Sequence, residues 1–174
     1  DDGYLLFIGR LEPHKGIGTL VEAARLVPDV KLVLAGRLGV PMSEMVAGPL
    51  PPNVEYVGFK SGAELDALRR NARAFVIPST WYENQPFSIL EAFAVGKPVI
   101  TTAIGGMREL VGENERGRIV PLGDAQALAE ALRWMHENPQ DAAVLGRRAY
   151  DYCLANHTPE VHYERVMGIY QQVS

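Results

Sequence analysis

The stretch YLLFIGRLEPHKGIGTLVEAARLV, residues 4–27, contains a complete strand, turn and helix. Residues 4–8 are apolar without alternation, which is typical of a parallel strand that is buried on both faces. After the turn, apolar residues recur at i, i+3, i+4, i+7 and i+10 and form one helical face: Ile17, Leu20, Val21, Ala24 and Val27. A buried strand that leads directly into an amphipathic helix is the repeating unit of an α/β fold.

The same alternation continues to the end of the chain. Further apolar runs predict strands at residues 30–35, 54–57, 74–77, 98–101 and 117–120. Helical patterns follow at residues 65–72, 89–94, 107–111, 124–137, 140–155 and 159–173. Because alternating strands and helices require right-handed crossovers, we expect an α/β fold with a doubly wound, Rossmann-like parallel sheet of about six strands and flanking helices. The last two helices have no strand between them, so we expect them to pack outside the sheet or to reach a neighbouring domain.

Composition narrows the class of protein. A length of 174 residues fits a single domain over residues 1–174, and 47% apolar with 22% charged residues argues against disorder. A formal net charge of −4 argues against a general nucleic-acid binder. The single cysteine, Cys153, favours a reducing compartment and therefore a cytoplasmic location. No apolar run approaches the roughly 20 residues of a membrane span. The chain enters its first strand directly after Asp1-Asp2-Gly3, without an initiator Met, so we expect it to be a piece of a longer protein.

The turn after the first strand is the first candidate site. In doubly wound sheets, ligands bind beyond the carboxyl ends of the strands. Here Arg10 and Lys15 flank a turn that runs into a helix N-terminus, where free N–H groups and the helix dipole favour an anion. Arg10 can fork onto phosphate oxygens and Lys15 can add a point charge. A solvated basic loop is the alternative interpretation. Neither a G-x-G-x-x-G nor a P-loop pattern is present.

The second candidate follows the fourth strand, at residues 78–91. Glu83 and Glu91 stand on either side of a loop-to-helix junction, where both can face a ligand that lies over the helix N-terminus. Two simpler interpretations compete: in one, Glu91 closes a capping box with Ser88, and in the other, Glu83 is an ordinary exposed loop acid. Trp81 and Tyr82 can stack on a sugar or base, but a half-buried aromatic pair that supports the loop is the favoured interpretation.

The third candidate is the glycine pair Gly105-Gly106, which follows the fifth strand. Paired glycines permit close approach of a ligand to the backbone, but they equally suit a tight turn. The four histidines show no metal-ligand spacing, and one cysteine cannot complete a zinc site, so no metal site is expected. No Ser-His-Asp or Cys-His arrangement can be assigned, and the G-x-S-x-G nucleophile elbow is absent.

Taken together and in this order, the three loops resemble the C-terminal domain of GT-B glycosyltransferases, and more narrowly the retaining family 4, the glycosyl transferases group 1. The family pattern G-R-L followed by K-G is present at residues 9–11 and 15–16. Its E-x7-E element runs from Glu83 to Glu91 and continues as residues 91–100, EAFAVGKPVI. The glycine pair followed by an acid is present at residues 105–109. The resemblance covers nearly the whole chain, and the ordered set of motifs is specific.

The resemblance implies a role for each matching residue. Arg10 and Lys15 would hold the diphosphate of a nucleotide-sugar donor and stabilise the leaving nucleoside diphosphate, with no metal cofactor required. Glu83 would lie beside the donor sugar, and Glu91 would accept hydrogen bonds from the ribose hydroxyls. The remaining donor-binding positions are Gly9, Gly16, Gly58, Phe59, Asn84, Gln85, Pro86, Phe87 and Ser88. Gly58 and Phe59 would meet the base. The usual E-G-F of the family is replaced here by Glu83-Asn84-Gln85, which restricts the backbone beside the sugar.

The resemblance also implies a function for the whole protein. It would transfer a sugar from a UDP- or GDP-sugar to an acceptor, with retention of configuration. This chain would be the C-terminal half of the GT-B fold, would bind the donor and would be inactive alone. An N-terminal domain of the same protein would bind the acceptor and make any membrane contact. Two other functions stay open: half of a nucleotide-sugar epimerase, which shares the fold, and a non-catalytic nucleotide-binding module.

Overall fold

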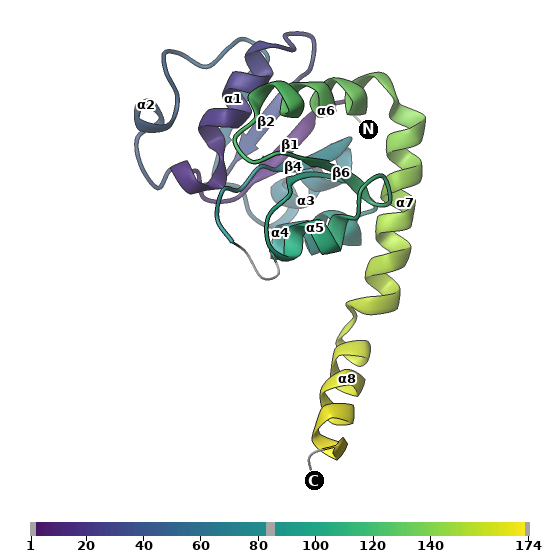
Figure 1. The fold of residues 1–174 in the computed structure, drawn as a ribbon. Coiled ribbons are helices and arrows are strands. Elements are labelled where there is room, and N and C mark those ends of the chain that lie inside the picture. The colour runs from purple at the N-terminus through teal and green to yellow at the C-terminus, as the bar shows by residue number, and fades with distance from the viewer. Residues whose placement is uncertain (1–2, 83–85, 173–174) are drawn as a thin grey trace.

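The computed structural model describes residues 3–82 and 86–172. Its centre is one sheet of parallel strands in the order β3-β2-β1-β4-β5-β6 (Figure 1). The strands are β1 (Leu5–Ile8), β2 (Leu32–Ala35), β3 (Val54–Gly58), β4 (Ala74–Ile77), β5 (Val99–Thr102) and β6 (Gly117–Val120). Each begins and ends within two residues of the range that the apolar runs predict. The predicted fold class, a doubly wound sheet of six parallel strands, is therefore confirmed.

The helices also follow the predicted pattern. They are α1 (Ile17–Arg25), α2 (Met42–Met45), α3 (Gly62–Asn71), α4 (Phe87–Ala94), α5 (Gly106–Val111), α6 (Ala125–Glu137), α7 (Pro139–Asn156) and α8 (Pro159–Gln172). Asp124 caps α6, because its Oδ1 accepts a hydrogen bond from the backbone N–H of Ala127 at 2.9 Å. The short 3-10 helix η1 (Pro13–Lys15) inside the turn after β1 was not predicted.

Two apolar layers cover the faces of the sheet. Leu5 and Phe7 of β1 face a layer to which α1 and α6 contribute, whereas Leu6 faces a layer to which α4 and α5 contribute. All three side chains are at most 2% exposed. The period-two alternation of a strand therefore sends neighbouring residues of β1 into opposite layers. A strand buried on both faces holds the residues that follow it in a fixed place.

The strand order reverses at β1, because the chain first builds β2 and β3 on one side and then returns to place β4 on the other. The segments that follow β1 and β4 therefore diverge at the carboxyl edge of the sheet and leave a crevice between them. Lys97 lies on the turn between α4 and β5, at the opposite edge, where burial lowers the pKa of its ammonium group.

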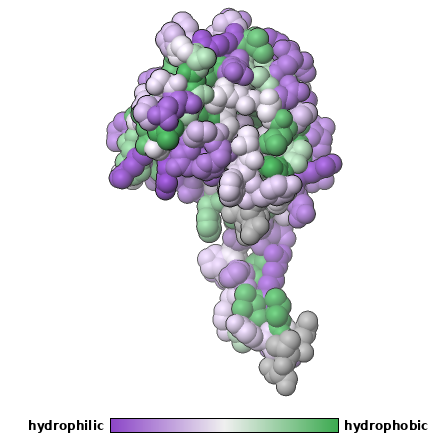
Figure 2. Space-filling model, turned by 60° about the vertical axis from the view of Figure 1, so that its left-hand side comes forward, coloured by the Kyte–Doolittle hydropathy of each residue, from purple (hydrophilic) through white to green (hydrophobic). Residues whose placement is uncertain are grey.

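The last two helices behave differently from each other. α7 packs against α4, outside the sheet as predicted, whereas α8 projects away from the body of the domain (Figure 1). Apolar side chains are exposed near the end of this projecting helix (Figure 2), and Ile169 is 61% exposed. No residue of α8 within 159–172 belongs to either core cluster. In the described ranges, 3–82 and 86–172, no helix combines the length and apolar character needed to span a bilayer.

Candidate functional site

The turn after β1 is held against the chain that leaves β4. Gly16 is the N-cap residue of α1 and has a φ of +75°. A side chain at this position would overlap the carbonyl oxygen of Pro78, so only glycine fits both the conformation and the space. Earlier in the turn, the backbone N–H of Leu11 donates to the carbonyl of Arg37 at 2.9 Å. The turn is therefore fixed on both sides by neighbouring strand ends.

A group of hydrogen bonds joins the same two segments. The carbonyl oxygen of His14 accepts from the Thr80 backbone N–H at 2.8 Å, from Thr80 Oγ1 at 3.1 Å and from Ser79 Oγ at 3.2 Å. Ser79 is 1% exposed, and its own carbonyl accepts from Thr102 Oγ1 at 2.6 Å. Sequence reasoning did not identify Ser79 or Thr80, because both act through contacts between segments more than 60 residues apart in the chain.

Between the ends of β1 and β4 lies a cavity of about 550 Å³, which we name the switch-point cavity. Its lining comes from β1, the turn after it, the end of β4 and the first turns of α4. The lining residues are Phe7, Ile8, Gly9, Arg10, Glu12, His14, Lys15, Ile77, Ser79, Phe87, Ser88 and Glu91. Two of the predicted candidate loops are thus brought together around one cavity, with two cations on one side and a helix N-terminus on the other.

Glu12 holds one of these cations in place. Its Oε1 is 3.0 Å from Arg10 Nη1, and its Oε2 is 3.2 Å from His14 Nε2. The Glu12 side chain is 20% exposed and packs so closely over Gly39 that a side chain on Gly39 would overlap it. Arg10, by contrast, is 69% exposed. Glu12 therefore orients the guanidinium at the cavity wall while leaving most of its donors available.

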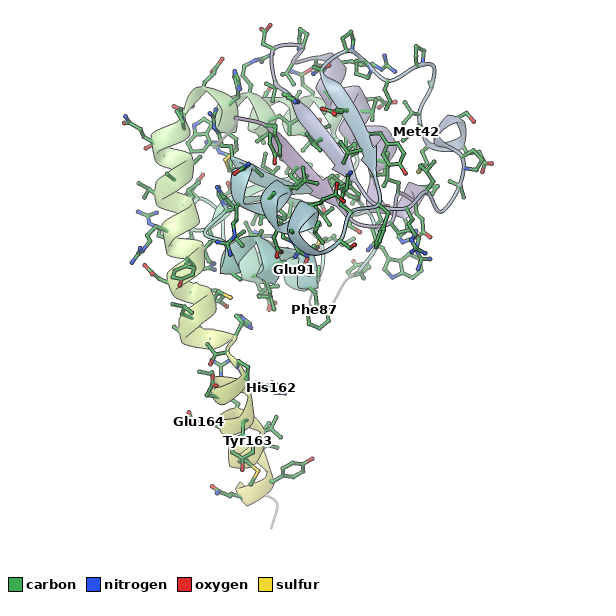
Figure 3. The ribbon with its side chains drawn as sticks, turned by 180° about the vertical axis from the view of Figure 1, so that it is seen from behind. Met42, Phe87, Glu91, His162, Tyr163 and Glu164 are labelled. Carbon is green, nitrogen blue, oxygen red and sulfur yellow. The ribbon has the colours of Figure 1, made fainter. Side chains whose placement is uncertain are left out.

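Glu91 reaches the cavity from the second turn of α4 (Figure 3). Its Oε1 is 2.8 Å from Nη2 of Arg69, a residue of α3. The residue that caps α4 is Pro86, with no side-chain hydrogen bond, so the interpretation of Glu91 as part of a capping box with Ser88 is wrong. The side chain of Glu91 is 42% exposed, which leaves carboxylate lone pairs for a ligand.

Three aromatic side chains near the start of α4 are exposed, and one of them, Phe87, lines the cavity. Trp81, Tyr82 and Phe87 are 64%, 77% and 79% exposed. The interpretation of Trp81 and Tyr82 as a half-buried pair is therefore wrong. The Trp81 ring meets the His14 ring edge-on, with centroids 5.8 Å apart. The next predicted site residues, Glu83, Asn84 and Gln85, lie outside the described residues.

A second, smaller pocket of about 250 Å³ lies beside the switch-point cavity, beyond the ends of β1, β2 and β3. We name it the strand-end pocket. Its lining residues are Ile8, Gly9, Arg10, Ala35, Gly36, Arg37, Phe59, Lys60 and Leu65. The Arg37 guanidinium lies over the Phe59 ring, 4.5 Å from its centroid. Gly58 precedes Phe59 with a φ of +72°, and its carbonyl accepts from the Gly36 N–H at 2.9 Å.

The third predicted loop takes no part in these two cavities. Gly105, with a φ of +55°, leads into the six-residue helix α5. Neither Gly105 nor Gly106 is among the residues that line the switch-point cavity or the strand-end pocket. The glycine pair therefore forms a strand-to-helix turn at the same edge of the sheet. Within residues 3–82 and 86–172, no cluster of three or more His, Cys, Asp or Glu side chains is arranged to hold a metal ion.

The sequence model for glycosyl transferases group 1 matches residues 1–152. The chain belongs to this family. It is 33% identical over 159 residues to the amylovoran biosynthesis glycosyltransferase AmsK of Erwinia amylovora, covering 83% of this chain and 39% of that protein. It is 29% identical over 190 residues to a phosphatidyl-myo-inositol mannosyltransferase of Mycolicibacterium smegmatis, covering 99% of this chain and 47% of that protein. This group 1 chain therefore spans less than half the length of these relatives.

Solved structures show the same fold. Sucrose-phosphate synthase from Thermosynechococcus elongatus superposes with a TM-score of 0.82 at 30% identity, over 98% of this chain and 45% of that one. HepE of Anabaena, solved in complex with UDP, gives 0.84 at 23% identity over 97% of this chain and 48% of that one. The C-terminal domain of a group 1 glycosyltransferase from Francisella tularensis gives 0.74, with 87% of that chain covered. The predicted resemblance to the C-terminal half of the GT-B fold is confirmed.

Proposed function

We propose that this chain is a single donor-binding domain of a retaining glycosyltransferase and that the switch-point cavity holds the diphosphate of the donor. One observation carries the proposal: Arg10 and Lys15 line the same cavity as the first residues of α4, at the point where the strand order reverses. Cationic side chains and the N–H groups of a helix N-terminus are the groups that bind phosphate in proteins. Hydrogen bonds to the His14 carbonyl join the turn that carries both cations to the segment after β4.

The chemistry follows from this geometry. When the bond between the sugar and the diphosphate breaks, negative charge grows on the leaving diphosphate. Arg10 and Lys15 are placed to stabilise that charge, and a rigid site needs no reorganisation at the moment of reaction. On this proposal the cations do the work that a metal ion does in other transferases. Gly9 lets the backbone run close beside the diphosphate, and Gly16 lets the turn pack against Pro78 so that Lys15 is held at the cavity.

The other parts of the donor have sites on the same edge of the sheet. Glu91, oriented by Arg69, accepts hydrogen bonds from the ribose hydroxyls, and the pocket beside Gly58 and Phe59 receives the base. Glu83 lies beside the donor sugar, and Asn84, Gln85 and Pro86 complete its binding site. Complexes of HepE with UDP and with UDP-glucose support a nucleotide-sugar donor for a chain of this fold.

The whole protein transfers the sugar with retention of configuration, in our proposal, and the acceptor site belongs to the part that corresponds to the other half of its relatives. That part also makes any contact with a membrane. The single cysteine favours a reducing compartment, so we place the activity in the cytoplasm. Incubation of the full-length protein with donor and acceptor, followed by NMR of the product, tests retention. Sugar transfer by residues 1–174 alone would contradict the proposal that the acceptor site belongs to another part of the protein.

Thermal unfolding tests donor binding directly. A nucleoside diphosphate at 100 times its dissociation constant should stabilise the chain by about 2.7 kcal/mol, which corresponds to a rise in Tm of about 5 °C or more. Arg10→Ala and Lys15→Ala should abolish most of this rise. Arg147→Ala is the matched control, because Arg147 is 75% exposed on α7, outside the switch-point cavity. If neither UDP nor GDP raises the Tm of the unmodified chain, the proposed function is wrong.

A further inference from the structure

We propose that the strand-end pocket takes uracil and selects against guanine, so that the donor is a uridine diphosphate sugar. This inference rests on the proposed function and goes one step further, because it names the base. Its starting point is the character of the pocket wall. Among the described residues that line the pocket, each side chain with hydrogen-bonding atoms is a cation: Arg10, Arg37 and Lys60.

Cationic side chains can donate hydrogen bonds but cannot accept them. The other lining residues are apolar or glycine and offer no side-chain acceptor: Ile8, Gly9, Ala35, Gly36, Phe59 and Leu65. A pocket with this wall satisfies acceptor atoms on a ligand far better than it satisfies donor atoms.

The backbone carbonyls of the wall reinforce this bias. The carbonyl of Ala35 accepts from the Gly9 N–H at 3.0 Å, and that of Arg37 accepts from the Leu11 N–H at 2.9 Å. The carbonyl of Gly36 accepts from the Tyr56 hydroxyl at 3.0 Å. Each of these three carbonyls therefore already accepts one hydrogen bond that joins the strand ends, which leaves each of them one lone pair rather than two.

The carboxylate of Glu64 on α3 does not add a hydrogen-bond acceptor to the pocket wall. Glu64 is 71% exposed, is not among the lining residues, and its Oε1 lies 3.1 Å from Lys60 Nζ. Its charge is thus neutralised by a pocket residue, Lys60. The side chains that line the pocket therefore still offer hydrogen-bond donors and no acceptor.

Uracil and guanine need different hydrogen-bond partners from the pocket wall. Uracil carries two carbonyl acceptors and a single N–H, whereas the pairing edge of guanine carries one carbonyl and the hydrogens of N1 and the N2 amino group. Guanine would leave those N–H groups without acceptors, which lowers its affinity for the pocket. The carbonyls of uracil instead receive charge-assisted hydrogen bonds.

A flat surface for the ring is also present. The Phe59 side chain is 58% exposed, although it is large and apolar, and the Arg37 guanidinium lies over its ring. Bases stack on aromatic rings and on guanidinium planes. Arg10 lines both this pocket and the switch-point cavity, so a base here and a diphosphate there belong to one ligand.

Isothermal titration calorimetry of residues 1–174 with UDP, GDP, ADP and pyrophosphate tests the inference. We expect UDP to bind at least tenfold more tightly than GDP and ADP, and pyrophosphate to bind more weakly than UDP. Lys60→Glu places an acceptor on the pocket wall, so it should reduce the preference for UDP over GDP at least threefold. Lys31→Glu is the matched control, because Lys31 is 58% exposed beside Glu55 and lies at the amino edge of the sheet. This control should keep the preference of the unmodified chain.

The outcomes separate the inference from the function on which it rests. Equal or tighter binding of GDP or ADP overturns the uracil assignment and leaves the donor-binding function standing. Failure of all four ligands to bind overturns the proposed function itself. Circular dichroism of both lysine variants verifies that each is folded. An unchanged UDP preference in folded Lys60→Glu would overturn the role given to the cationic wall.

Discussion

The switch-point cavity and the strand-end pocket share Ile8, Gly9 and Arg10, yet they are built in different ways. The first is held by contacts to main-chain atoms: Gly16 has no room for a side chain beside the Pro78 carbonyl, and the His14 carbonyl accepts three hydrogen bonds from Ser79 and Thr80. The second also contains a close approach of two backbone segments, because a side chain on Gly36 would overlap the carbonyl oxygen of Gly9, but its wall beyond β2 and β3 is formed largely by the side chains of Arg37, Phe59 and Lys60. The difference indicates that the position of the diphosphate is set by the fold, whereas the choice of base is set by a few replaceable side chains.

The largest effect on stability is expected from alanine substitutions at two glycines, one near each cavity. Gly16 and Gly58 have similar positive φ angles, +75° and +72°, but only Gly16 faces a backbone atom where a side chain would stand. We expect Gly16→Ala to lower the free energy of unfolding by about 3 kcal/mol or more, and Gly58→Ala by about 1 kcal/mol. Urea denaturation of both variants measures the difference. Equal losses would contradict the claim that backbone packing closes the first cavity.

Separate replacement of Arg10 and of Arg37 should distinguish binding of the diphosphate from binding of the base. Arg10 lines both cavities, so Arg10→Ala should weaken UDP and pyrophosphate about tenfold each. Arg37 lies over Phe59 in the strand-end pocket, so Arg37→Ala should weaken UDP about fivefold and leave pyrophosphate unchanged. Calorimetry with both ligands provides the comparison. Loss of pyrophosphate binding in Arg37→Ala would show that the two cavities do not divide the ligand as proposed.

A smaller effect is expected at the ribose, between the two cavities. Arg69 contacts Glu91 at 2.8 Å and is itself 18% exposed. Arg69→Gln removes the charge that orients the Glu91 carboxylate, so UDP should bind about two- to threefold more weakly. The affinity for 2′,3′-dideoxyuridine diphosphate should not change, because that ligand has no ribose hydroxyls for Glu91 to contact. An equal loss for both ligands would place the role of Arg69 elsewhere.

The sequence predicts the fold well because the decisive signals are local. Each buried strand is a short apolar run, and each helix carries its own apolar face, as residues 4–27 illustrate. The meeting of Arg10, Lys15 and Glu91 around one cavity was also predictable, because strand order alone brings the ends of β1 and β4 together.

The rest depends on contacts between distant segments, which local patterns do not contain. Glu91 matches a capping box in sequence, but it pairs with Arg69 of another helix. Glu12 resembles an ordinary loop acid until the structure places Arg10 and His14 at its two oxygens. Trp81 has a large aromatic side chain of the kind that usually packs in a core, and only the structure shows that it is exposed. In each case tertiary packing, rather than propensity, decides what the residue does.

The central claim is that a diphosphate binds between the turn after β1 and the start of α4. Backbone NMR of the ¹⁵N-labelled chain during a titration with UDP tests it most directly, because each amide reports its own surroundings. We predict that the largest shifts fall on residues 9–16 and on Phe87 and Ser88, and that pyrophosphate moves the same amides while leaving residues 58–60 in place. Shifts confined to other parts of the chain, or no shifts at saturating UDP, would contradict the account.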